Sequence, residues 1–195
     1  DNVLSELKNS VTTIDFEKIL DDISEDNEIV LLGECTHGTL EFYQMRSTIT
    51  KKLITRRGYR VVLLEAEWPA IYRVNRYINW DGVDNSAPES LSGITGFPLW
   101  MWKNSVIEEL VEWLRNYNRD LEPTDRVQIL GMDCYSFLES KKMLLDYLKK
   151  VDPPFHETVK KNLSFLDHFN NPTEYAREVT GGQLRQYSGK IQNLF

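Results

Sequence analysis

The chain has 195 residues and a formal net charge of −7, from 23 Lys and Arg against 30 Asp and Glu. This acidic balance argues against a nucleic-acid binder, which needs a basic face, and against adhesion to an anionic membrane. The sequence has no apolar run near the ~20 residues of a spanning helix. It shows no secretory signal and contains two cysteines. We therefore expect a globular, cytoplasmic protein that binds neither nucleic acid nor membrane.

Three short apolar runs are typical of buried strands. They cover residues 29–32, 61–64 and 127–130, and each is followed closely by a carboxylate. Helical periodicity covers residues 40–57, 69–78, 105–117 and 137–151, and a further amphipathic segment covers 157–169. Residues 80–96 are rich in glycine and predict a long loop or a loop with a short helix. The tail over 174–195 has a helical pattern that Gly181 and Gly182 interrupt.

This alternation of strands and helices predicts an α/β fold with a mostly parallel central sheet flanked by helices. We expect residues 1–195 to form a single domain of this class or the first half of a larger one. Ligands bind beyond the carboxyl ends of the strands in such sheets. If the strands are neighbours, Glu34, Glu65 and Asp133 gather there. Acids at strand ends are often only solvated loop residues, but three of them beside His37 favour a site.

The segment GECTHGT over residues 33–39 is the densest group of polar residues. It places His37 at the entrance of the first predicted helix. A histidine exchanges a proton near neutral pH and therefore suits general-base catalysis. A carboxylate beside it would fix its tautomer and support the imidazolium, and Glu34 and Glu65 are the candidates. The alternative is that His37 caps the helix or faces solvent.

Arg46 lies beside the apolar stripe of the helix predicted over 40–57, four residues after Phe42 and three before Ile49. A guanidinium in that position needs a carboxylate partner, which Glu34 or Glu65 can supply. Arg46 then either makes a structural salt bridge or holds a substrate carbonyl or developing oxyanion.

Two tryptophans are candidates for contacts with a small-molecule substrate. Trp68 follows the second strand, and Trp102 ends the aromatic run FPLWMW over 97–102. Both also suit the edge of an ordinary core. The sequence lacks paired zinc cysteines, a P-loop and a dinucleotide glycine fingerprint, and we expect no metal and no cofactor. A metal held by Glu34, His37 and Glu65 is nevertheless chemically possible.

Taken together, these motifs resemble the erythromycin esterase family, many members of which are called succinoglycan biosynthesis proteins. The resemblance runs from about residue 28 to about residue 148. It rests on LGECTHG at 32–38, EFY at 41–43 with Arg46, EAEWP at 65–69, VNRY at 74–77 and FPLWMW at 97–102. Family members are longer and have a second functional histidine in the later half, so the chain resembles their first half.

The resemblance implies hydrolysis of the lactone ester of macrolide antibiotics. His37 would activate water, and Glu34 and Glu65 would orient and tune this histidine. Arg46 would position the substrate or stabilise charge. We therefore expect a metal-independent carboxylic ester hydrolase with a small-molecule ester as its substrate. Two alternatives remain open: a metal- or tetrapyrrole-binding module that uses the same cluster, and an accessory protein of exopolysaccharide (succinoglycan) biosynthesis.

Overall fold

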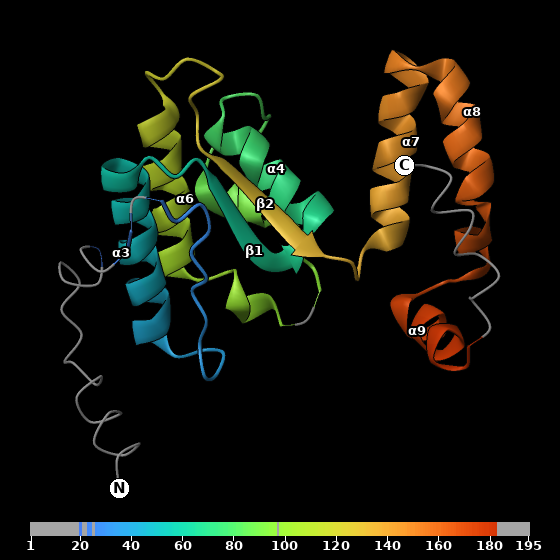
Figure 1. Cartoon of the computed structure of the whole chain (residues 1–195), viewed down its shortest axis with the longest axis horizontal. Coiled ribbons are helices and arrows are strands. Elements are labelled where there is room, and N and C mark those ends of the chain that lie inside the picture. Colours follow the sequence, from blue (N-terminus) through green and yellow to red (C-terminus); the bar gives the residue numbers. More distant parts are fainter. Residues whose placement is uncertain (1–19, 21–22, 25, 97, 183–195) are drawn as a thin grey trace, which may run out of the picture.

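The computed structural model describes residues 20, 23–24, 26–96 and 98–182 (Figure 1). Within these ranges lie seven α-helices, two 3₁₀ helices and one two-stranded parallel sheet, which confirms the predicted α/β class. The elements are α3 (Leu40–Arg57), β1 (Val61–Glu67), α4 (Trp68–Ile78), α5 (Ala87–Leu91), η1 (Leu99–Met101), α6 (Ser105–Asn118), β2 (Gln128–Asp133), α7 (Phe137–Val151), α8 (Pro153–Asn162), η2 (Ser164–His168) and α9 (Pro172–Thr180).

The two strands pair from Val61 opposite Gln128 to Glu67 opposite Asp133, with an irregularity between Leu64 and Glu67. The backbone of β1 passes close to Gly131 of β2. A Cβ atom built there would lie 2.4 Å from the carbonyl oxygen of Ala66. The carboxyl ends of β1 and β2 therefore meet only because residue 131 has no side chain.

The main core lies between the sheet and the helices on one side of it. α4 packs directly on the strands, and α6 packs against α3 and α4 (Figure 1). The most deeply buried apolar side chains of this core are Ile54, Ile71, Val74, Tyr77, Ile78, Leu91, Val111, Leu114, Val127 and Ile129. The buried side chain of Asn118 fixes the start of β2, because it donates to the Val127 carbonyl (2.9 Å) and accepts from the Val127 amide (2.8 Å).

The strand predicted over residues 29–32 is wrong, since the described part of the chain has no strand in this segment. Val30 and Leu32 pack against the small core that Ile49 and Leu53 of α3 form. Ile29 and Leu31 are 76% and 89% exposed. The apolar run therefore reflects burial of alternate residues against a helix, not pairing with β1.

The helix boundaries follow the local sequence signals closely. Gly58 ends α3 in the left-handed region at φ 74°. The prolines that end α7 also occupy the first turn of α8, so the segment predicted over 157–169 is replaced by α8 and η2. α9 ends at Gly181. The rest of the helical pattern predicted over 174–195 lies outside the described residues from 183 onward, as does Phe97.

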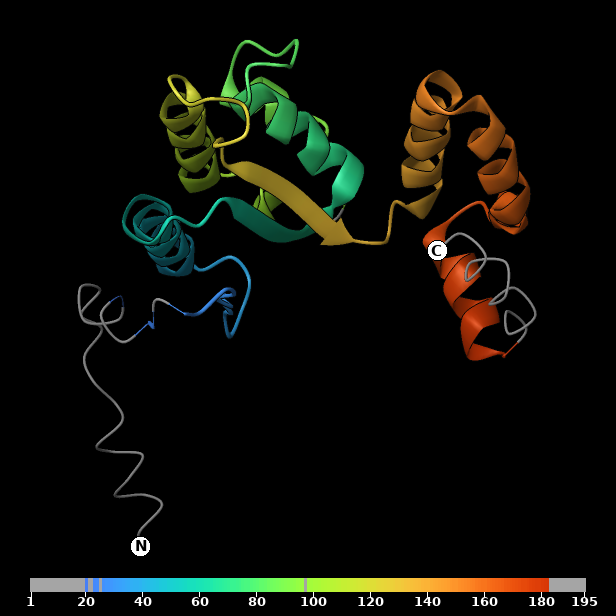
Figure 2. The same ribbon diagram turned by 45° about the horizontal axis from the view of Figure 1, so that its top comes forward.

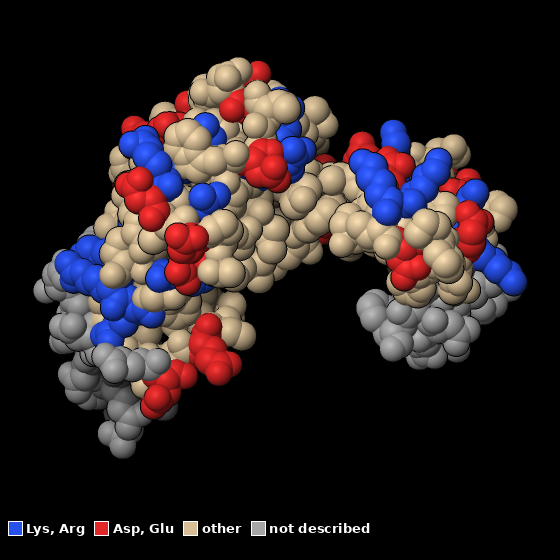
Figure 3. All heavy atoms as spheres, turned by 90° about the horizontal axis from the view of Figure 1, so that it is seen from above, with Lys and Arg blue, Asp and Glu red and all other residues tan. Residues whose placement is uncertain are grey.

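The helices α7, α8 and α9 lie together beyond the carboxyl end of β2 in both ribbon views (Figure 2). α7 packs against α8 and reaches the main core through α4. Seen from above, the middle of the molecule, where the main core meets α7, has few charged side chains (Figure 3). No helix within the described ranges has both the length and the apolar character needed to cross a membrane.

Candidate active site

Glu34 joins His37 and Arg46 through its two carboxylate oxygens. Its Oε1 atom lies 2.6 Å from His37 Nδ1, and its Oε2 atom lies 2.8 Å from an Arg46 guanidinium nitrogen. The Glu34 side chain is 6% exposed, against 45% for His37 and 20% for Arg46. An ionised carboxylate only accepts hydrogen bonds, so this contact favours the tautomer of His37 with its proton on Nδ1. The Nε2 atom of the neutral ring is then free to accept one.

The turn before α3 sets the direction of the His37 ring. Gly38 has a φ of +87°, and a Cβ atom on it would lie 3.1 Å from the Trp100 ring. The backbone conformation therefore favours glycine strongly, and a side chain there would also crowd Trp100. The His37 and Trp100 rings are tilted, with centroids 6.5 Å apart. The turn places His37 between the carboxylate of Glu34 and this indole.

Aromatic rings enclose the Arg46 guanidinium. It lies 4.7 Å from the centre of the Tyr43 ring and 5.7 Å from that of Trp102. Rings at this range attract a cation through their faces. Burial, and then the nearby charge of Glu34, raises the pKa of Tyr43 above its usual value. Tyr43 was expected only as part of the family motif EFY, although it precedes Arg46 by three residues and so shares its side of the helix.

A cavity of about 350 Å³ adjoins His37. Carboxylates and mostly apolar side chains line it: Glu65, Ala66, Glu67, Ala70, Ile94, Pro98, Met101, Trp102, Asp133 and Tyr135, with Gly96. Glu65 and Asp133 thus come together at the ends of neighbouring strands, as the strand pattern predicts. This mixture of apolar walls and a few polar groups is typical of a small-molecule site.

The carboxylates of the cavity disfavour one another's ionised form. Burial, followed by the charges of Glu139 and Asp133, raises the pKa of Glu67. Burial and the charge of Glu65 raise the pKa of Asp133. Perturbed acids in a cavity often mark a functional site. Glu67 was not among the candidate catalytic residues, although the sequence places two acids, Glu65 and Glu67, at the end of this strand, where they suit the binding of a polar ligand.

Of the remaining predicted site residues, Glu65 and Trp102 line the cavity, whereas Trp68 does not. The structure pairs His37 and Arg46 with Glu34, whereas Glu65 lines the cavity and its backbone carbonyl accepts from the Trp102 indole at 2.9 Å. Trp68 lies outside the cavity wall, because its ring stacks on Tyr72 one helical turn later, with centroids 5.0 Å apart. Trp102 does line the cavity, but it is a buried wall residue with its N–H already bonded.

The described acids, histidines and cysteines are spread apart rather than grouped as metal ligands. Over the described ranges, no group of three or more His, Cys, Asp or Glu side chains is placed to hold a metal ion. The set of Glu34, His37 and Glu65 is therefore not brought together as ligands. Cys35 and Cys134 are exposed free thiols.

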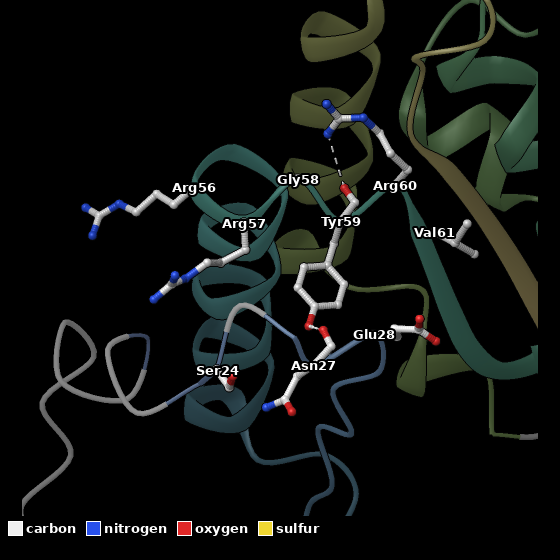
Figure 4. A pocket seen from close by; sticks show the side chains of 9 residues that line it. All are labelled: Ser24, Asn27, Glu28, Arg56, Arg57, Gly58, Tyr59, Arg60 and Val61. Carbon is white, nitrogen blue, oxygen red and sulfur yellow. Dashed lines mark hydrogen bonds between the residues drawn. The ribbon is translucent and has the colours of Figure 1, made fainter.

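A second hollow, of about 580 Å³, lies at the carboxyl end of α3 (Figure 4). Its walls are Ser24, Asn27, Glu28, Arg56, Arg57, Gly58, Tyr59, Arg60 and Val61. The three guanidinium groups point in different directions (Figure 4). Arg57 donates to the Leu20 carbonyl at 2.8 Å, and Arg60 reaches the Tyr59 carbonyl at 3.4 Å. The arginines do not converge on a common point where an anion would bind.

The chain belongs to the erythromycin esterase family, whose model matches residues 54–194. This match includes Glu65, Glu67, Trp102 and Asp133 and begins after Arg46. The predicted family membership is thus confirmed, while the roles of Glu34, His37 and Arg46 rest on the geometry above.

Individual relatives agree with this assignment. An erythromycin esterase type II from Escherichia coli is 24% identical over 139 residues, which make up 69% of this chain and 31% of that protein. The crystal structure of a succinoglycan biosynthesis protein has a TM-score of 0.64 at 23% identity, over 84% of this chain and 40% of that one. A Bacillus cereus protein has a TM-score of 0.52 at 25% identity, over 69% and 31% of the two chains. The chain therefore spans less than half the length of these relatives.

Proposed function

We propose that this chain carries the water-activating part of a carboxylic ester hydrolase. The observation that carries the proposal is the Glu34 carboxylate, which is bound to His37 on one oxygen and Arg46 on the other, beside a cavity. Membership of the erythromycin esterase family supports the same reaction class.

The chemistry follows from the state of the His37 ring. The Nε2 atom takes a proton from water, and the resulting hydroxide attacks the carbonyl carbon of the ester. The charge of Glu34 stabilises the imidazolium that forms. The tetrahedral intermediate then collapses, the acyl C–O bond breaks, and the proton on Nε2 passes to the leaving alkoxide. The products are an acid and an alcohol, and no bond to the protein is formed.

Arg46 acts through Glu34 in this proposal. Its guanidinium forms an ion pair with the carboxylate at 2.8 Å and lies against the rings of Tyr43 and Trp102, so it holds Glu34 in place. The sequence left two roles open for Arg46, a structural salt bridge and a contact with the substrate, and the ion pair with Glu34 supports the first. Arg46 is therefore a positioning residue.

The substrate class that we propose is a small-molecule ester that enters the cavity beside His37. A macrolide lactone is the first compound to test, because the E. coli relative is an erythromycin esterase. The metal-binding alternative gains no support from the described residues, which form no set of three or more ligand side chains. The accessory role in exopolysaccharide synthesis is suggested only by the name of one structural relative.

The test is mass spectrometry of erythromycin incubated with the longest natural polypeptide that contains this chain. The proposal predicts a product heavier by one water, and a rate that falls roughly 10²- to 10⁴-fold in the His37→Asn variant. His168→Asn is the matched control, because His168 is an exposed histidine outside the cavity wall. Equal rates in both variants would overturn the role of His37. Absence of product with erythromycin and with a panel of simpler esters would overturn the hydrolase proposal itself.

A further inference from the structure

Four buried polar atoms of side chains have no hydrogen-bond partner within the part of the chain that the structure describes. Three of them belong to one cluster: Oε2 of Glu34, the hydroxyl of Tyr43 and a terminal guanidinium nitrogen of Arg46. Glu34 and Arg46 attract each other as charges at 2.8 Å, but these atoms do not meet with the alignment of a hydrogen bond. Buried polar groups without a partner cost stability, so native proteins keep few of them. Three such atoms around the partner of His37 indicate that function rather than stability shapes this cluster.

Tyr43 reaches both parts of the site from the main core. Its side chain is 4% exposed and belongs to that core. Its ring lies against the Arg46 guanidinium, 4.7 Å from the ring centre. Its hydroxyl lies near the amide of Gly38, in the turn that carries His37, but without the geometry of a hydrogen bond. Tyr43 is therefore connected to His37 both through this turn and through the Arg46–Glu34 pair.

The Tyr43 hydroxyl is a neutral dipole beside the Glu34 carboxylate. Burial, and then the negative charge of Glu34, raises the pKa of Tyr43, whereas the Gly38 amide and Arg46 lower it in part. A protonated phenol can turn its O–H bond, and no acceptor holds this one in a fixed direction. In a buried environment of low dielectric constant, such a bond points its hydrogen toward a nearby anion. The dipole thus adds to the positive charge of Arg46 in holding the Glu34 carboxylate.

We propose that Tyr43 is a positioning residue, whose ring and hydroxyl hold Arg46 and Glu34 in the arrangement that fixes the His37 ring. The ring supports the guanidinium, which a phenylalanine ring would also do. The hydroxyl favours the orientation of Glu34 that presents Oε1 to His37. Because this hydroxyl forms no hydrogen bond, it gives the fold no stability that phenylalanine would lack. The expected effect on turnover rests on the proposed hydrolase function, whereas the effect on the His37 ring does not.

Tyr43→Phe tests the hydroxyl alone, and Tyr77→Phe is the matched control. Tyr77 is 1% exposed and has the Arg115 guanidinium 4.1 Å from its ring centre, but its hydroxyl donates to Glu112 at 2.7 Å. Thermal unfolding of the longest natural polypeptide compares the two variants. Tyr43→Phe should unfold at the wild-type temperature or above it, and Tyr77→Phe at a lower temperature because it loses a hydrogen bond. An equal loss of stability in both variants would show that the Tyr43 hydroxyl is structural and would overturn the proposal.

¹⁵N NMR of the His37 ring gives the readout that a purely structural role would not change. The loss of a signal in His37→Asn identifies this ring. Tyr43→Phe should shift the ratio of the two neutral tautomers roughly twofold or more toward a proton on Nε2, because Glu34 is held less firmly. Tyr77→Phe should leave the ratio unchanged. An unchanged ratio in Tyr43→Phe, or an equal shift in both variants, would overturn the proposal.

Kinetic measurements separate this proposal from the proposed function. If an ester is hydrolysed, Tyr43→Phe should lower kcat by about threefold or more with KM little changed, and Tyr77→Phe should alter neither. A change confined to KM would overturn the positioning role. If no ester is hydrolysed, the hydrolase proposal fails, and the NMR comparison still decides the role of Tyr43.

Discussion

The Nδ1 atom of His37 lies 2.6 Å from Oε1 of Glu34, and Glu34 in turn lies against Arg46 on its other oxygen. The carboxylate is buried, while nearly half of the imidazole is exposed toward the cavity. The buried carboxylate of Glu34 therefore orients the exposed imidazole of His37. Because Glu34 contacts both residues, the ion pair that holds Glu34 on Arg46 of α3 also sets the orientation of the His37 ring.

Replacing Glu34 by Gln should reduce hydrolysis far more than it alters ester binding. The amide keeps the size of the side chain but cannot stabilise the imidazolium that forms when His37 accepts a proton. We expect kcat to fall by about 10² or more, with KM little changed. Steady-state kinetics on the preferred ester checks this. A change confined to KM would contradict the role given to Glu34.

Replacing Arg46 by Met should destabilise the protein, because the buried Glu34 carboxylate then lacks its cation. Breaking a fully buried pair costs about 3–5 kcal/mol, and the partial exposure of Arg46 lowers the expected loss to about 2 kcal/mol. Urea unfolding measures this loss. In the Glu34→Gln background the same Arg46→Met change should cost clearly less, and equal costs in both backgrounds would contradict the coupling.

Gly131→Ala tests the close approach that brings the strand ends together. The added Cβ would overlap the backbone of Ala66 and Glu67, so the strands must separate where the cavity acids are held. We expect a loss of about 2–3 kcal/mol. Gly33→Ala is the matched control, because a Cβ there meets nothing within 4 Å. Comparable unfolding curves for the two variants would contradict this packing.

Glu67→Gln should stabilise the protein at neutral pH. Burial, then the charges of Glu139 and Asp133, raises the pKa of Glu67 above its ordinary 4.5, so the folded state binds its proton more readily than the unfolded state. The favourable contribution of Glu67 to the free energy of unfolding is fully present below pH 4.5, the pKa of the unfolded state, and is lost as the pH rises through the pKa of the folded state. The variant should therefore unfold at a higher temperature than the wild type at pH 7 and at a similar temperature near pH 4. Thermal unfolding across this range checks the difference, with Glu109→Gln on the surface of α6 as control.

The sequence predicted those parts of the fold that local signals determine. The pattern over 40–57 and the following Gly58 reproduce the bounds of α3, and the run over 137–151 reproduces those of α7. The run over 29–32 was misassigned because hydrophobicity shows that a residue prefers burial and not which element buries it. Val30 and Leu32 find that burial on α3.

The site was predictable to a similar extent. His37, Glu34 and Arg46 lie within thirteen residues around one helix entrance, so closeness in the sequence and charge pairing indicate a cluster, although the sequence left Glu65 open as an alternative partner. The contact of Glu67 with Asp133 depends on strand register and on the bulge before Glu67, which no local pattern reveals. Trp68 was placed at the site because of its position after β1, but stacking on Tyr72 turns its ring elsewhere.

The central claim is that Glu34 fixes the His37 ring with its proton on Nδ1 and leaves Nε2 free to accept a proton. ¹⁵N NMR of histidine-labelled protein tests this directly, since the chain has three histidines and the His37→Asn variant identifies the signal. For the neutral ring, the account predicts a protonated Nδ1 and an unprotonated Nε2, and a loss of this preference in Glu34→Gln. A proton found mainly on Nε2, or a tautomer ratio that does not respond to Glu34→Gln, would contradict it.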